Sequence, residues 1–315
     1  MTDSGSSSAD LTVAVIDLGA TSTRLLVLGA GLEVRESTIT RTGEGLGRHG
    51  EITAPAMERV RSCLVEYMHV VKGASVDALR IVATSAARDA SNRDNFFDMV
   101  EGCCGVRPDL LTGNEEGRLA FAGATNGLDH LGGVMMIDIG GGSTEFVTGT
   151  IDDGLIDVLS VDLGASRVTE AYLDSDPPLA SELSAALSVI GLHLDDVRRE
   201  LRGVADALSS GGTVIGVGGT ITTVTAVEIG LLEYDRDQVH GYRLKRPDLE
   251  EVFRTLATEP ANDRRHNPGL AEDRVDLIVG GACILVETFR QLDLDELLIS
   301  ENDLLDGVAA EMSGS

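Results

Sequence analysis

The chain has 315 residues, of which 43% are hydrophobic, and this length supports two domains that each have a core of their own. A formal net charge of −27 and an aromatic content of 3% argue against general binding to nucleic acid or to an anionic membrane. The four cysteines form no Cys-x-x-Cys pair, so the sequence predicts neither a zinc ribbon nor thioredoxin-like redox chemistry.

The first residues carry no targeting signal that we can identify. Residues 1–10 are rich in serine and lack an apolar stretch, so we expect a disordered tail and not a signal peptide. No apolar run reaches the roughly 18 residues that a membrane-spanning helix requires. These features predict a soluble, cytoplasmic protein.

A pattern near the start of the chain returns in its second half. Residues 16–24 read IDLGATSTR, and residues 137–145 read IDIGGGSTE. Each copy follows one short apolar stretch and precedes another. We therefore expect two β-hairpins whose turns carry an aspartate, glycines and hydroxyl groups.

The segments after each hairpin also correspond. Apolar patterns predict in both halves a third strand, a helix, a buried strand, and a closing strand and helix. The expected strands and helices lie at 33–40, 57–71, 79–85, 109–112 and 115–123 in the first half, and at 155–161, 183–194, 213–220, 296–300 and 304–312 in the second. The sequence thus predicts two similar α/β domains, at 11–130 and 131–315, with a cleft between the hairpins. Spacing leaves open whether the last helix packs back on the first domain.

The glycine turns are candidate phosphate sites because exposed backbone N–H groups and missing Cβ atoms let phosphate oxygens approach closely. A single Asp-x-Gly turn is more often an ordinary hairpin, but two copies in register favour a functional interpretation, as does a third turn. Asp17 and Asp138 would face one ion from opposite walls, which suits Mg²⁺, and Glu145 would hold a metal-bound water. The candidate phosphate-binding residues are Gly19, Ala20, Thr21, Ser22, Gly140, Gly141, Gly142, Ser143, Thr144, Gly218 and Gly219.

These turns resemble the phosphate and adenosine motifs of the superfamily of actin, sugar kinases and heat-shock chaperone ATPases, whose fold is a duplicated ribonuclease H-like unit. Within that superfamily, the chain is similar to the exopolyphosphatase and guanosine-pentaphosphate phosphatase family. The resemblance spans roughly residues 11 to 310. Its motifs are DLGATS at 17–22, ATSAARDASN at 83–92, TGNEEGR at 112–118, DIGGGSTE at 138–145 and a later stretch at 269–281.

The resemblance implies a Mg²⁺-dependent enzyme that removes the terminal phosphate of inorganic polyphosphate or of pppGpp, and a homodimer. It also implies that Glu116 is the catalytic base and that Arg88 contacts phosphate. The residues alone allow other interpretations: Glu116 would merely favour a helix N-terminus, and Arg88 would pair with Asp89 or Asp94. The basic run at 264–266 would guide a distal phosphate or, as we expect, form an exposed loop.

Two departures from the family pattern affect the expected substrate contacts. Ala20 and Thr21 stand where the family usually has Ser-Asn, and Leu305 stands near the C-terminus where it commonly has arginine. Larger members append a helical domain, and its absence from this sequence predicts a preference for short polyphosphate. The alternatives are a small-molecule kinase, for which no zinc loop appears, and a non-enzymatic nucleotide sensor.

Overall fold

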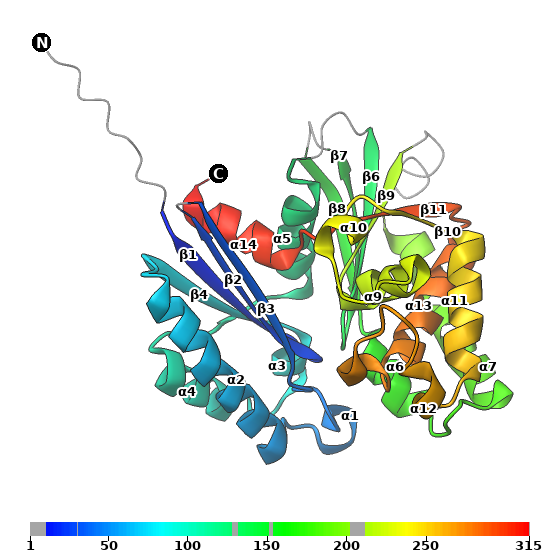
Figure 1. Ribbon diagram of the computed structural model, residues 1–315, viewed down its shortest axis with the longest axis horizontal. Coiled ribbons are helices and arrows are strands. Elements are labelled where there is room, and N and C mark those ends of the chain that lie inside the picture. The colour runs from blue at the N-terminus through cyan, green and yellow to red at the C-terminus, as the bar shows by residue number, and fades with distance from the viewer. Residues whose placement is uncertain (1–10, 30, 128–131, 151–153, 202–211, 315) are drawn as a thin grey trace, which may run out of the picture.

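The computed structural model describes residues 11–29, 31–127, 132–150, 154–201 and 212–314. Two mixed sheets lie side by side and define two lobes (Figure 1). The tail expected at 1–10 and most of the expected domain boundary lie outside the described residues, so the division at 130/131 stays a prediction. None of the described helices has the length and apolarity that crossing a membrane requires.

The first lobe carries a five-stranded sheet in the order β3-β2-β1-β4-β5. Its helices α2 and α4 cover one face of the sheet. Its elements are β1 (Val13–Leu18), β2 (Ser22–Gly29), β3 (Leu32–Ile39), α1 (Leu46–His49), α2 (Ala54–Gly73), β4 (Ala78–Ala83), α3 (Ser85–Asp89), α4 (Arg93–Cys104), β5 (Asp109–Leu110) and α5 (Gly113–Thr125).

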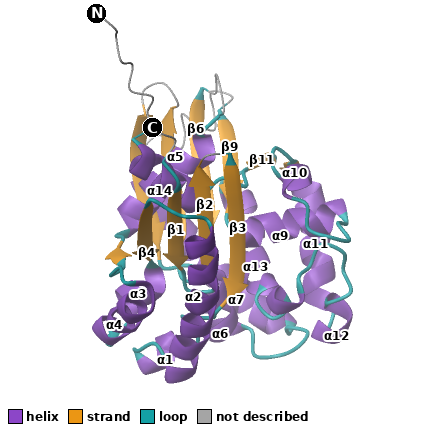
Figure 2. Cartoon of the chain, turned by 60° about the vertical axis from the view of Figure 1, so that its left-hand side comes forward, coloured by secondary structure: helices purple, strands orange, loops and turns teal. Residues whose placement is uncertain are grey.

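The second lobe carries a six-stranded sheet in the order β10-β11-β9-β6-β7-β8. Helices α9, α11, α12 and α13 gather on one side of it (Figure 2). Its elements are β6 (Gly133–Ile139), β7 (Thr144–Thr150), β8 (Gly154–Val161), α6 (Ala165–Tyr172), α7 (Ala180–Glu200), β9 (Thr213–Val217), α9 (Gly219–Ile229), α10 (Arg236–Val239), β10 (Arg243–Lys245), α11 (Arg246–Thr258), α12 (Ala261–Arg264), the 3₁₀ helix η1 (Glu272–Arg274), α13 (Ile278–Gln291), β11 (Glu296–Ile299) and α14 (Leu304–Ser313).

The two sheets share one topology, which confirms the predicted duplicated, actin-like fold. Both hairpins are antiparallel, and each first strand continues the sheet by pairing in parallel with β4 or β9. Asp17 faces Arg24 across the first hairpin, and Asp138 faces Glu145 across the second. The motifs that coincide in sequence therefore occupy equivalent places in space.

The second lobe contains an edge strand that the repeat does not predict. Strand β10 is three residues long and pairs antiparallel with β11 at the edge of the sheet. Its burial pattern is a single buried leucine between two exposed basic residues. A run this short gives too little apolar alternation to be read as a strand from sequence.

Helices α5 and α14 lie together between the two sheets (Figure 1). Their apolar side chains join residues of β1, β4, β6 and β9 in one core that both lobes share. The last helix therefore packs back on the first sheet, including β1 and β2. This common core joins the two lobes.

The crossing of α5 and α14 is closest at two glycines. A Cβ atom at Gly307 would lie 1.9 Å from the backbone oxygen of Leu119, and one at Gly123 would lie 1.9 Å from that of Asp303. Both contacts are with backbone, which cannot move aside without separating the helices. The crossing distance therefore depends on the absence of side chains at these positions.

We expect Gly307→Ala to lower the free energy of unfolding by about 1–3 kcal/mol, because overpacking a dense core costs this much. Chemical denaturation measures the change. Gly102→Ala, in an open position of α4 with no atom within 4 Å, is the matched control and should be neutral or slightly stabilising. Equal stability of the two variants would contradict the close crossing.

Candidate active site

The two predicted phosphate turns meet at the interface of the lobes. A backbone hydrogen bond of 3.0 Å closes each turn, from Gly19 to the oxygen of Ser22 and from Gly140 to that of Ser143. A Cβ atom at Gly141 would lie 2.1 Å from Oγ1 of Thr21, so only glycine lets the turns come this close. The Thr21 hydroxyl also hydrogen-bonds that of Ser166, at the start of α6, at 2.8 Å. The two turns thus share one crevice.

A cavity of about 650 Å³ opens at these turns. Most of the residues predicted to bind phosphate or metal line it, including the third turn that opens α9. The lining contains Asp17, Gly19, Ala20, Thr21, Ser22, Glu116, Asp138, Gly140, Gly141, Ser143, Glu145, Gly218 and Gly219.

Three predicted residues are not part of the lining. Thr144 is fully buried, and its hydroxyl donates to the backbone oxygen of Leu163, so this side chain serves the hairpin itself. Gly142 packs against Ser85, whose Oγ lies 2.6 Å from where a Cβ atom would stand. Arg88 stands behind the lining and reaches it through Glu116.

Glu116 is turned inward at the start of α5. Thr112 caps this helix and forms a capping box with Glu115, so Glu115 satisfies the helix end and Glu116, one residue on, is buried. Arg88 donates from Nη1 to Oε2 of Glu116 at 2.7 Å and to the oxygen of Leu111 at 3.0 Å. Burial raises the pKa of Glu116, although the Arg88 guanidinium opposes the rise.

The surface ion pair considered for Arg88 is absent from the described residues. Asp89 instead pairs with Arg167 of α6 at 2.7 Å, and Arg167 also donates to the oxygen of Gly142 at 3.0 Å. Arg88 Nη2 lies 3.5 Å from Oγ of Ser143, in the second turn. Arg88 therefore lies between the buried glutamate and the second glycine turn.

The cavity contains three buried carboxylates besides Glu116, and one of their oxygens has no hydrogen-bond partner among the described residues. Asp17 Oδ2 accepts from Nε and Nη2 of Arg24, at 2.9 and 2.7 Å, while its Oδ1 is buried without any hydrogen bond. Burial and the carboxylate of Asp303 raise the pKa of Asp138 to about 7. Burial and the nearby Glu116 raise the pKa of Glu145, which accepts a hydrogen bond from Ser160 at 2.7 Å.

Within the described residues, no three acidic, histidine or cysteine side chains form a ready metal cage. Mg²⁺ rarely uses such a cage, because it keeps several waters and binds through one or two carboxylates together with substrate phosphates. The unpartnered Oδ1 of Asp17 supplies one such ligand, and Asp138 faces the same cavity from the other lobe. The donor set therefore fits Mg²⁺.

Four arginines that sequence reasoning did not single out also line the cavity: Arg24, Arg35, Arg236 and Arg274. The repeat held a signal for Arg24, because it occupies the position of Glu145 in the second copy. The guanidinium of Arg274 packs on Gly219, 2.6 Å from where a Cβ atom would stand. Three of these arginines are paired with carboxylates, and Arg274 is the one for which the described residues show no ion pair.

The basic run at 264–266 differs from the expected exposed loop. Arg264 is only 3% exposed, and it donates hydrogen bonds to the backbone oxygens of Leu256, Glu259 and Val275. It also pairs with Asp176 at 3.1 Å. The guanidinium satisfies carbonyl groups at the ends of neighbouring segments, so its role is structural and the expectation was wrong for this residue.

Comparison with known proteins matches the sequence to the Ppx/GppA phosphatase family over residues 29–315. The chain is 35% identical to exopolyphosphatase 2 of Mycobacterium tuberculosis, over 96% of this chain and 98% of the relative. It is 27% identical to the guanosine-5'-triphosphate,3'-diphosphate pyrophosphatase of Pseudoalteromonas translucida, over 95% of this chain and 59% of the relative.

Two solved structures are similar over nearly the whole chain. The crystal structure of an exopolyphosphatase-like protein superposes with a TM-score of 0.91 at 32% identity, and covers 96% of this chain and 99% of its own. The Aquifex aeolicus PPX-GPPA enzyme superposes with a TM-score of 0.76 at 28% identity, with the same coverage. Sequence and structure together confirm the resemblance that the turn motifs indicated: the chain belongs to the Ppx/GppA phosphatase family.

Proposed function

We propose that the protein is an exopolyphosphatase that hydrolyses the terminal phosphoanhydride bond of inorganic polyphosphate. One observation carries this proposal: Glu116 is buried beside two opposed phosphate turns and is held there by Arg88. A hydrolase needs such a base next to the phosphoryl group, whereas a module that only binds nucleotide does not. The relatives named exopolyphosphatase support the same substrate.

In this mechanism the terminal phosphate lies against the backbone N–H groups of the turns at Gly19–Ser22 and Gly140–Ser143. Glu116 orients a water molecule in line with the scissile bond and takes its proton as the oxygen attacks phosphorus. The P–O bond to the rest of the chain breaks, and that oxygen leaves with the shortened polyphosphate. Arg88 holds the Glu116 carboxylate in place and adds positive charge near Ser143.

Asp17 and Asp138 are the residues that would hold Mg²⁺. Glu145 would accept a hydrogen bond from a water on the ion. When bound, the ion would neutralise developing charge on the phosphoryl oxygens. Oδ1 of Asp17 supports the assignment because a buried carboxylate oxygen without a partner is costly unless a ligand uses it. The homodimer and the cytoplasmic location stay predictions.

A second candidate substrate is pppGpp, on which a relative named as its pyrophosphatase acts. The observation that favours it is an apolar and aromatic part of the cavity, lined by Leu231, Leu232 and Tyr234. Such a surface suits a nucleoside better than further phosphates. Both substrates end in a phosphoanhydride and would use the same base.

We expect purified protein with Mg²⁺ to release orthophosphate from polyphosphate without any acceptor alcohol. The substrates are ranked by measuring the orthophosphate that is released from polyphosphate, pppGpp and ATP in parallel assays. Phosphate transfer only in the presence of an alcohol would indicate a kinase. Tight nucleotide binding without turnover would indicate a sensor, and either result would overturn the proposal.

A further inference from the structure

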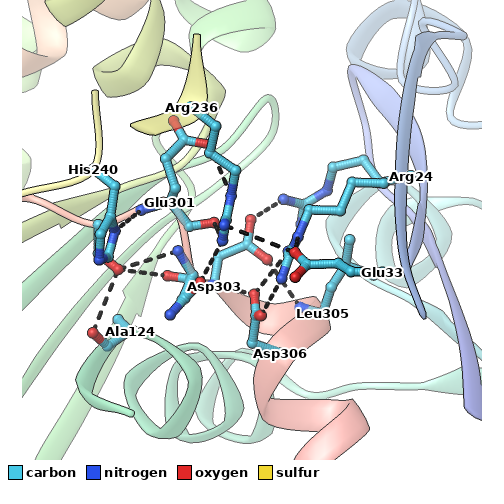
Figure 3. Close-up of polar contacts among 12 residues, drawn as sticks. Arg24, Glu33, Ala124, Arg236, His240, Glu301, Asp303, Leu305 and Asp306 are labelled. Carbon is cyan, nitrogen blue, oxygen red and sulfur yellow. Dashed lines mark hydrogen bonds and ion pairs between the residues drawn. The ribbon is translucent and has the colours of Figure 1, made fainter. Parts of the chain in front are cut away.

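The connection from β11 into α14 is acidic and runs along the cavity wall. Glu301 and Asp303 line the cavity, and Asp306 follows in the first turn of α14. Figure 3 shows these three side chains close to Arg24, which comes from the first lobe, and Arg236, which comes from the second. We call residues Glu301–Asp306 the acidic segment.

The acidic segment and Glu33 bind three of the four cavity arginines. Asp303 forms an ion pair with Arg24 (Figure 3), and Asp306 binds Arg35 through both oxygens, one of them at 3.1 Å from Nη1. The carboxylate of Glu301 lies 3.8 Å from Nε of Arg236. Glu33 on β3 completes the set, at 2.6 Å from Arg35 Nε and 3.7 Å from Arg236 Nη1.

Arg274 differs from these three arginines. It has no carboxylate within ion-pair distance among the described residues, and its guanidinium lies at the third glycine turn. Arg88 lies next to the second turn, but it stands outside the lining and is already paired with Glu116 at 2.7 Å. The cavity therefore has one arginine at a glycine turn without a carboxylate partner among the described residues, Arg274, and three arginines at the acidic segment that carboxylates already neutralise.

A polyphosphate carries about one negative charge per phosphate, so each further unit that reached the acidic segment would meet carboxylates as well as arginines. Like charges repel each other more strongly in a partly buried cavity than in bulk water, because the effective dielectric constant there is lower. Partial exposure of these side chains and salt reduce this repulsion, but they do not reverse its sign. Four carboxylates against three arginines leave this wall with a net negative charge, which opposes phosphates beyond those that the turns hold.

We propose that Glu301, Asp303 and Asp306 are specificity-determining residues that restrict the cavity to a few terminal phosphates. The inference rests on the proposed function, and it gives the expected preference for short polyphosphate a cause within this cavity. The same carboxylates also build the helix start, since Asp303 caps α14 and Asp306 accepts the backbone N–H of Asp303 at 2.9 Å. The positions of the Asp303 and Asp306 side chains are therefore set by the start of this helix.

The test replaces one carboxylate by its amide. Asp306→Asn keeps an oxygen that accepts the Asp303 N–H, yet removes the charge that neutralises Arg35. We expect the KM for long-chain polyphosphate to fall about tenfold, and the KM for tripolyphosphate to change less than twofold. Higher ionic strength should shrink the difference between variant and wild type.

Glu311→Gln is the matched control, because it removes one carboxylate from the same helix, where Glu311 pairs with Arg80 and Arg118 outside the cavity lining. It should leave both KM values unchanged. If Asp306→Asn fails to fold, the same KM values are measured for Glu33→Gln, which removes the other carboxylate that pairs with Arg35. Equal changes for long and short chains, or no change for either, would overturn the inference.

Failure of this inference is distinguishable from failure of the proposed function. If the wild-type protein releases no orthophosphate from any chain, the proposed function fails. Calorimetric titration of the same variants with tripolyphosphate and with long-chain polyphosphate then decides the inference by binding alone. Tighter binding of the long chain to Asp306→Asn, and not to Glu311→Gln, would support it, and identical isotherms would overturn it.

Discussion

Glu116→Gln should lower kcat for orthophosphate release by about 10²–10⁴-fold, which is the usual contribution of a general base. The amide has nearly the shape of the carboxylate and can still accept the hydrogen bond from Arg88, but it cannot take a proton from water. Substrate contacts with the glycine turns do not involve Glu116. The KM should therefore stay within a few-fold of the wild-type value, and steady-state kinetics of phosphate release measures both constants.

Glu115→Gln is the matched control for this variant. Glu115 is the neighbouring residue, and its carboxylate forms a capping box with Thr112 at the N-terminus of the same helix. The control should retain most of the wild-type kcat, with at most a small loss of stability. A Glu116→Gln enzyme that turned over as fast as wild type would remove this residue as the base.

The raised pKa of Glu116 predicts the direction in which kcat changes with pH. The base acts as a carboxylate, so kcat should fall as the pH drops through its pKa, and burial places that fall above the range of an ordinary glutamate. Arg88 limits the shift by stabilising the charged form. Arg88→Gln should therefore move the acidic limb of the profile toward higher pH.

The duplicated hairpins were the part of the fold that the sequence predicted best. The first strand of each hairpin is apolar on both faces, and the turn that follows holds the Asp, Gly and hydroxyl pattern in a single register. Turn chemistry and strand periodicity are local properties, so nine residues are enough to reveal them. The position of Asp17 opposite Asp138 then followed from the repeat alone.

Side-chain contacts between segments that are far apart in the chain could not be predicted from the sequence. Asp303 lies 279 residues from Arg24 in the chain and contacts it only because α14 crosses back between the lobes. Arg264 looked like part of an exposed basic loop, whereas three backbone oxygens draw its guanidinium into the interior. Composition and spacing carry no information on such contacts, since burial of a charged residue depends on partners brought by the tertiary fold.

Mg²⁺ binding should become weaker as the pH falls below about 7, by close to tenfold per pH unit for one displaced proton. Burial and the charge of Asp303 raise the pKa of Asp138 to about 7, and a divalent ion must displace the proton that this carboxyl carries at lower pH. Titration of the protein with Mg²⁺ in a calorimeter, in buffers of different ionisation enthalpy, measures both the affinity and the proton released. An affinity that is constant between pH 6 and 8 would contradict the assignment.

The same shift predicts how the metal-free fold responds to pH. Asp138 has an unfolded pKa near 3.9, so between about pH 4 and pH 7 the folded state holds more protons than the unfolded state. The free energy of unfolding should therefore fall as the pH rises through this window, by a few kcal/mol from this group. Mg²⁺ should raise Tm more at pH 8 than at pH 6, because it stabilises the ionised carboxylate. Asp138→Asn should be more stable than wild type at pH 8 without metal and should lose most of the Mg²⁺ effect, since the amide has no charge to desolvate and is a weaker ligand.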